Sequence, residues 1–157
     1  MVNHIFKSTA RFKGGYNGEG TIENKHLKYK ISIPAEMNGP DIGTNPDEML
    51  MSAAVTCFTI TLSSYFEKNN LPVEVNHVDA TATISVNKGI QIYESITYVV
   101  YLERTADNES IDMKILKRII DKAENNCMIT KALKGNVEVS IESIYLDEQY
   151  IFHEDTI

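Results

Sequence analysis

Residues 44–72 read TNPDEMLMSAAVTCFTITLSSYFEKNNLP, and this stretch decides the fold. Its spacing predicts one long helix. Asn45 is a preferred N-cap, Pro46 suits the first turn, and Glu48 follows three residues after the cap, where its side chain can reach back. The closing Asn-Asn-Leu-Pro, residues 69–72, is a stop signal.

The predicted helix is apolar on nearly every side. Its apolar residues are Met49, Leu50, Met51, Ala53, Ala54, Val55, Cys57, Phe58, Ile60, Leu62, Tyr65 and Phe66. A helix with almost no polar stripe is normally buried, so we expect a sheet or a second subunit to cover it. Cys57 lies in its middle, and the functional argument depends on this cysteine.

Length, composition and charge set the class of protein. A chain of 157 residues with 43% hydrophobic and 24% charged residues predicts a single domain, residues 1–157, with a real core. The net charge of −7 argues against a nucleic-acid partner, which normally requires a basic face. The N-terminus lacks the apolar core of a signal peptide, and threonines, serines and an acidic first turn argue against a membrane-spanning role for the long helix. We therefore expect a cytoplasmic protein without a membrane partner.

The remaining elements follow from hydrophobic spacing. We predict strands at 4–13, 20–24 and 27–33, a long hairpin that turns at 87–89 and returns over 92–102, a helix at 111–126 and a last strand from 137. No role is assigned to the acidic tail after Leu146. Strands grouped apart from helices predict an α+β domain, with antiparallel sheets packed around the long buried central helix.

The two cysteines are the candidate chemistry. Cys57 and Cys127 both lie on apolar helical stripes, so their sulfurs can meet if the two helices pack through those stripes. Two interpretations stay open, a redox pair or two inert core residues. Because Cys57 lies about three turns into its helix, beyond the reach of the helix dipole, we expect a reactive thiolate there to need a neighbouring cation.

The histidines do not suggest a metal site. His4, His26, His77 and His153 show no metal-ligand spacing with one another or with the cysteines, so we expect no metal cofactor.

Two motifs resemble those of a known family. The segment from Thr44 to Leu50, followed by Ala53-Ala54 and Cys57-Phe58, resembles the first cysteine motif of the OsmC/Ohr family, the osmotically inducible and organic hydroperoxide resistance proteins. Cys127 followed by ALKGNVEV at 132–139 resembles the second. The resemblance extends over essentially the whole chain in element order and length.

The resemblance implies an OsmC-like fold and an activity. It implies an intertwined homodimer with the long helices at its centre, and a thiol-dependent peroxidase that reduces organic hydroperoxides in oxidative stress defence. Cys57 would be the peroxidatic cysteine, Cys127 the resolving cysteine, and Asp47 the acidic site residue. The partners would be a second copy of the chain, a small peroxide and a dithiol reductant, with no metal, haem or flavin.

The sequence also departs from the family pattern. Tyr16 and Met37 stand at the two positions where the family carries an arginine beside the thiolate, and Asp47 replaces a glutamate. Glu124 and Met128 replace the histidine and proline of the second motif. These departures favour an alternative, a catalytically weakened member that acts as a small apolar ligand-binding or redox-responsive dimer.

Overall fold

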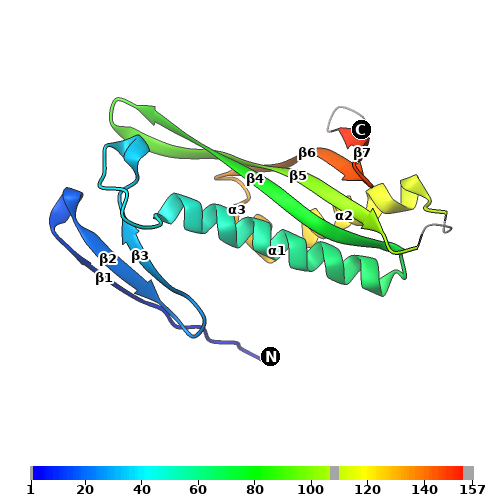
Figure 1. Ribbon diagram of the computed structural model, residues 1–157, viewed down its shortest axis with the longest axis horizontal. Helices are drawn as coiled ribbons and strands as arrows, with labels where there is room; N and C mark the ends of the chain where they lie inside the picture. The colour runs from blue at the N-terminus through cyan, green and yellow to red at the C-terminus, as the bar shows by residue number, and fades with distance from the viewer. Residues whose placement is uncertain (1, 107–109, 154–157) are drawn as a thin grey trace. The chain divides into compact units, whose positions relative to one another are not determined.

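The computed structural model describes residues 2–106 and 110–153 (Figure 1). Residues 154–157, the end of the acidic tail, lie outside the described residues. The chain divides into two compact units, the first ending at Met49 and the second beginning at Leu50.

The first unit is a small antiparallel sheet. Strands β1 (Thr9–Lys13), β2 (Glu19–Glu23) and β3 (Lys28–Ser32) pair in chain order, with the short 3-10 helices η1 (Gly15–Asn17) before β2 and η2 (Ala35–Met37) after β3. The strand predicted at 4–13 begins only at Thr9 in the structure. The physical reason is that Thr9 already pairs with Glu23, where β2 ends, so the preceding residues have no partner strand.

The second unit holds a four-stranded sheet in the order β4-β5-β6-β7. Its strands are β4 (Val73–Asn87), β5 (Ile90–Arg104), β6 (Glu138–Leu146) and β7 (Gln149–His153). The β4–β5 hairpin turns at Lys88 and Gly89, both with positive φ (51° and 81°), as a two-residue hairpin turn requires. The pair β5–β6 is parallel, because α2 and α3 lie between these strands in the chain.

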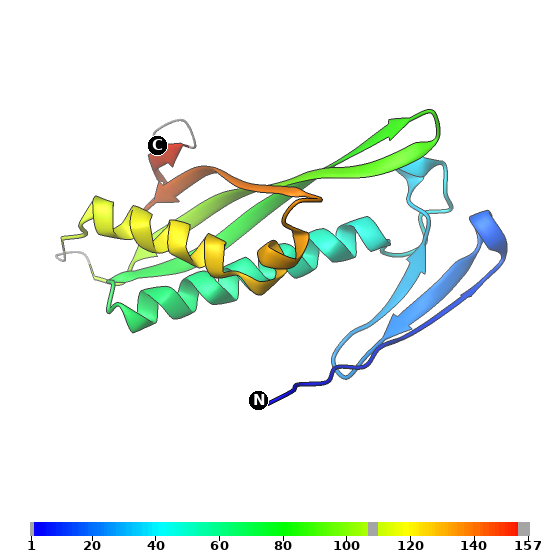
Figure 2. The same cartoon turned by 180° about the vertical axis from the view of Figure 1, so that it is seen from behind.

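Three helices complete the structure, α1 (Pro46–Lys68), α2 (Met113–Asn126) and α3 (Met128–Leu133). In the second unit α1 and α2 lie side by side against one face of the sheet (Figure 1, Figure 2). The predicted α+β class and the predicted long helix are confirmed.

The core lies between that sheet face and the two helices. Alternate residues of β5 point inward and meet one stripe of each helix. The buried residues at this contact are Ile96, Tyr98, Val100 and Leu102 from β5, Ala54, Phe58, Leu62 and Phe66 from α1, and Leu116, Ile119, Ile120 and Ala123 from α2. The predicted stripe of α2 is therefore the stripe that packs.

The start of α1 follows its predicted capping. The side-chain oxygen of Asn45 accepts hydrogen bonds from the backbone N–H groups of Asp47 and Glu48, each at 3.0 Å. The Glu48 carboxylate accepts from the Thr44 hydroxyl at 2.7 Å, where we expected it to turn back to the cap residue. The cap holds the start of the helix that carries Cys57.

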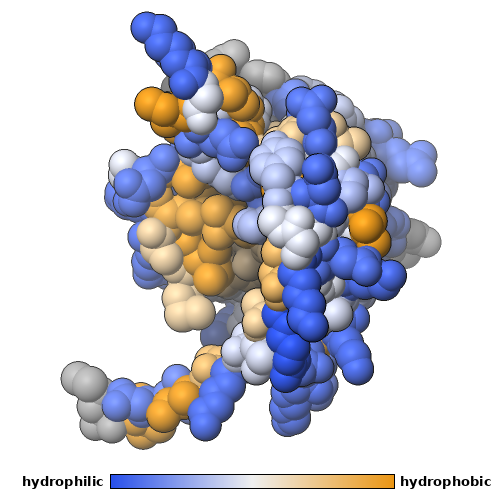
Figure 3. All heavy atoms as spheres, turned by 90° about the vertical axis from the view of Figure 1, so that its left-hand side faces the viewer, coloured by the Kyte–Doolittle hydropathy of each residue, from blue (hydrophilic) through white to orange (hydrophobic). Residues whose placement is uncertain are grey.

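Within one chain α1 is covered on one side only. About 22% of the most apolar stretch of this helix is buried, and the side chain of Ile60 is 65% exposed. By length and composition it is the one helix among the described residues that could cross a membrane, a test that core helices also pass. The face viewed in Figure 3 shows a group of apolar side chains beside charged ones. Such exposed apolar surface marks an interaction site.

Candidate active site

The structure brings the two predicted cysteines together. Cys57 is half-buried near the middle of α1, one residue before the buried Phe58. Cys127 is fully buried at the junction where α2 ends and α3 begins. The S–H of Cys127 donates a hydrogen bond to the sulfur of Cys57. The pair therefore links the middle of α1 to the α2–α3 junction.

The surroundings of Cys57 favour its thiolate. Burial raises the pKa of this thiol, but the hydrogen bonds that its sulfur receives outweigh the burial and leave the pKa lowered. The donors are the Cys127 thiol, the backbone N–H groups of Ile129 and Met128, and the Thr61 hydroxyl. These donors are neutral, whereas the sequence led us to expect a cation.

Cys127 shifts in the opposite direction. Burial raises the pKa of its thiol, and so does the hydrogen bond shared with Cys57, while contacts with Thr130 and Ile129 lower it by less. The pair therefore favours one thiolate, on the half-buried Cys57, and one thiol, on the buried Cys127. This is the arrangement expected of a nucleophile and a second cysteine that reacts after it.

The other predicted site residue, Asp47, belongs to the first unit. It lies in the first turn of α1, ten residues before Cys57, and its backbone N–H donates to the cap residue Asn45 at 3.0 Å. Its side chain is half-buried.

Tyr16 and Met37, the two positions at which the resemblance implies an arginine, contact each other. The Tyr16 hydroxyl, from η1, donates a hydrogen bond to the backbone carbonyl of Met37, from η2. Two arginines of the chain are paired with carboxylates. Arg11 contacts Glu23 at 2.6 Å and lowers the pKa of that carboxyl group, and Arg104 contacts Asp147 at 3.4 Å.

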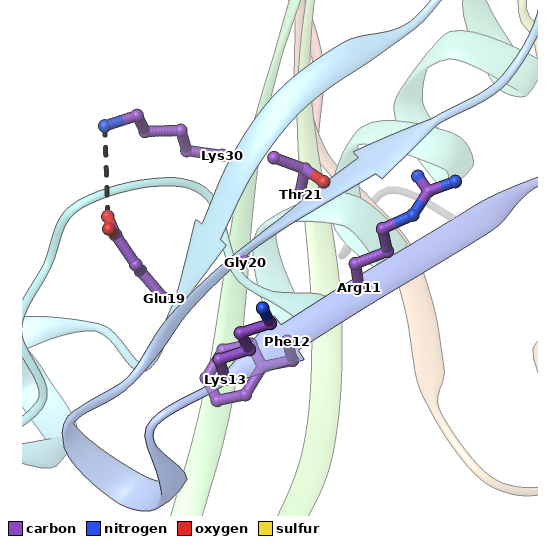
Figure 4. Close-up of a pocket in the computed structure, with 7 residues that line it drawn as sticks. All are labelled: Arg11, Phe12, Lys13, Glu19, Gly20, Thr21 and Lys30. Atoms are coloured by element: carbon purple, nitrogen blue, oxygen red, sulfur yellow. Dashed lines mark ion pairs between the residues drawn. The ribbon is translucent and has the colours of Figure 1, made fainter.

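A surface hollow of about 300 Å³ lies against the three-stranded sheet (Figure 4). It is lined by Arg11, Phe12, Lys13, Glu19, Gly20, Thr21 and Lys30. The Nζ atom of Lys30 lies 3.9 Å from Oε2 of Glu19. The hollow contains none of the predicted site residues. Among residues 2–106 and 110–153, no group of three or more histidine, cysteine, aspartate or glutamate side chains could hold a metal ion.

Three residues near the sulfurs were missed from the sequence. Thr61 lies one helical turn after Cys57, so its spacing in the sequence was a usable signal. Thr130 lies in the helix that starts after Cys127, at a similar spacing. Tyr98 carried a weaker signal, a single hydroxyl in an otherwise aliphatic stripe of β5.

Comparison with known proteins assigns the family. The sequence model described as "OsmC-like protein" matches residues 39–142, which include both cysteines. The chain belongs to the OsmC-like family. The resemblance seen in the two cysteine motifs is thereby confirmed.

Individual relatives of this OsmC-like protein agree with the family. The Bacillus subtilis protein YmaD, whose function is not assigned, is 39% identical, with 91% of this chain and 95% of that protein covered. An organic hydroperoxide resistance protein of Xanthomonas axonopodis is 28% identical over 87% of this chain and 93% of its own. The crystal structure of the organic hydroperoxide resistance protein OhrB of Bacillus subtilis matches the fold with a TM-score of 0.64 at 21% identity, covering 90% of this chain and 98% of that one.

Proposed function

We propose that this OsmC-like protein is a thiol-dependent peroxidase that reduces organic hydroperoxides. One observation carries the proposal, the hydrogen-bonded cysteine pair in which the half-buried sulfur has the lowered pKa. The names of several relatives, organic hydroperoxide resistance proteins, support the same substrate class.

In the first step the Cys57 thiolate attacks the outer oxygen of the hydroperoxide. A sulfur–oxygen bond forms and the oxygen–oxygen bond breaks, so the sulfur is oxidised by two electrons to a sulfenic acid. The leaving alkoxide takes a proton from water and departs as the alcohol. The hydrogen bonds to Cys57 serve this step because the thiolate is the nucleophile.

In the second step the Cys127 thiol gives up its proton and attacks the Cys57 sulfur. A disulfide forms, and the sulfenic hydroxyl leaves with that proton as water. Since the two sulfurs are already hydrogen-bonded, their approach requires little movement of α1 or of the α2–α3 junction. A dithiol reductant then restores both thiols by exchange. Such a cycle requires a reducing compartment, so we place it in the cytoplasm.

The proposed substrate carries an apolar group. Met128, next to Cys127, is 72% exposed and offers apolar surface to such a group. Its backbone N–H also contacts the Cys57 sulfur, so this methionine lies beside the reacting atom.

We further propose that the working form is a homodimer built on α1. The exposed face of this helix contains Ala53, Thr56, Ile60 and Ser63, spaced three and four residues apart. A second copy of the same face would cover Ile60, which is 65% exposed. Small side chains around it allow two helices to approach closely.

A separate observation favours an alternative function. Tyr16 and Met37 contact each other where the family carries an arginine, which favours a weakened member that binds a small apolar ligand or responds to redox state. In that case the thiol pair would change oxidation state without sustained turnover.

Peroxide consumption separates the two functions. We expect the purified protein to consume cumene hydroperoxide in the presence of dithiothreitol, and the Cys57→Ser variant to consume it no faster than buffer, because the hydroxyl is not ionised at neutral pH. A Cys57→Ser variant as fast as the wild type would contradict the proposal. Oxidation of the wild type once, without turnover, would favour the redox-responsive alternative.

A further inference from the structure

The Tyr98 hydroxyl, buried near the sulfur pair, lacks a hydrogen-bond partner among the described residues. In the part of the chain that the structure describes, the buried side-chain polar atoms without a hydrogen bond of good geometry are the hydroxyl oxygens of Tyr98 and Thr130. Thr130 lies beside the Cys127 sulfur. Unsatisfied buried groups are rare in proteins, so the buried Tyr98 hydroxyl requires an explanation.

Tyr98 is held in place by its neighbours. It lies on the inward face of β5, is 0% exposed, and its ring stacks on that of Phe58 with the centroids 5.0 Å apart and the planes 6° from parallel. Phe58 directly follows Cys57 in α1. This stacking fixes the tyrosine ring against the part of α1 that carries the reactive sulfur.

The Tyr98 hydroxyl stays protonated and lies close enough to both sulfurs to interact with them electrostatically. Burial raises its pKa strongly, and a negative charge on the Cys127 or the Cys57 sulfur raises it further. The hydroxyl therefore keeps its proton throughout the range in which the Cys57 thiolate forms.

Packing does not explain the hydroxyl. A phenylalanine would fill the same space and stack equally well, whereas a buried hydroxyl without a partner destabilises the chain. A group that costs stability at a reactive site is expected to serve a state other than the resting one.

We propose that the Tyr98 hydroxyl donates a hydrogen bond to the oxygen that the Cys57 sulfur acquires from the peroxide. The inference rests on the proposed peroxidase function. When Cys127 attacks the Cys57 sulfur, the sulfur–sulfur bond forms and the sulfur–oxygen bond breaks. The hydrogen bond from Tyr98 stabilises the charge that develops on the departing oxygen, which takes the Cys127 proton and leaves as water.

The test compares two tyrosine-to-phenylalanine variants on the same strand. Tyr98→Phe removes the inward hydroxyl, and Tyr101→Phe removes one from the opposite face, where Tyr101 stacks between His77 and Tyr145. Each protein is mixed with one equivalent of cumene hydroperoxide, quenched at intervals and analysed by mass spectrometry for Cys57 sulfenic acid and for the Cys57–Cys127 disulfide.

Tyr98→Phe is expected to slow the conversion of sulfenic acid to disulfide about tenfold, the worth of one hydrogen bond to a developing charge. Its initial oxidation rate should stay close to that of the wild type, and its thermal unfolding midpoint should rise by roughly 3 °C, because an unsatisfied group is removed. Tyr101→Phe should match the wild type in both steps.

Three outcomes would overturn the inference, and they differ in what else they contradict. If the wild type is oxidised and Tyr98→Phe forms the disulfide equally fast, the role of Tyr98 is wrong while the peroxidase function stands. If the wild type is not oxidised at all, the proposed function fails and the inference falls with it. Equal slowing in both variants would also contradict a specific role for Tyr98.

Discussion

Cys127→Ser is expected to react once with peroxide and then stall. Cys57 keeps its thiolate in this variant, because the serine hydroxyl can donate the hydrogen bond that the Cys127 thiol donates in the wild type. Without the second thiol, the sulfenic acid on Cys57 must wait for an external reductant. A thiol held in contact acts at an effective concentration far above that of a millimolar dithiol, so we expect turnover to fall roughly a hundredfold or more.

The measurement is a burst experiment. One equivalent of cumene hydroperoxide should be consumed per chain at the wild-type rate, followed by slow turnover, and dimedone should label Cys57 quantitatively. The matched control is Cys57→Ser, which should give no burst and no label. A Cys127→Ser variant that turns over like the wild type would show that Cys127 is not the resolving cysteine.

Ile60→Asp is expected to convert the proposed homodimer into monomers. Ile60 is 65% exposed in the single chain, so an aspartate there should leave the chain folded, while the dimer would have to bury two carboxylates against each other. The cost of several kcal/mol per buried charge weakens association by a factor on the order of a thousand or more.

Analytical ultracentrifugation measures this effect, with Ile115→Asp as the control. Ile115 is a 38% exposed isoleucine on α2, so the same chemical change is made away from the proposed interface. The wild type and Ile115→Asp should sediment as dimers and Ile60→Asp as a monomer. An Ile60→Asp dimer would place the interface elsewhere, whereas a monomeric wild type, or one that partitions into membranes, would contradict the homodimer itself.

The sequence was sufficient to predict α1 because its signals are local. The cap at Asn45, the proline after it and the stop at residues 69–72 each act within a few residues. The placement of Cys57 and Cys127 on apolar stripes was likewise readable from helical spacing. The two sulfurs then meet if these two stripes pack together.

Strand β7 was not predicted because its turn lacks the usual signal. The hairpin between β6 and β7 turns at Asp147 and Glu148, which adopt φ values of 51° and 64° although neither is glycine or asparagine. Glutamate is an unusual residue for this backbone conformation, so the segment after Leu146 read only as an acidic tail.

The activation of Cys57 depends on tertiary placement. The amides of Met128 and Ile129 come from a segment far along the chain from α1, and only packing brings them to the Cys57 sulfur. Sequence spacing identifies charged side chains as candidate partners of a thiolate, but backbone amides are present at every non-proline residue and carry no sequence signal. For this reason the sequence led us to expect a charged side chain beside Cys57 and not the backbone amides.

The central claim is that neutral donors lower the pKa of the Cys57 thiol, and the pH dependence of its alkylation tests this most directly. A thiol with a lowered pKa gains its thiolate at lower pH, so iodoacetamide should label Cys57 with a midpoint below that of an unstructured cysteine peptide measured alongside. Cys127→Ala, which removes one donor, should move this midpoint upward, while Cys127→Ser should move it less. A wild-type midpoint at or above that of the peptide would contradict the account.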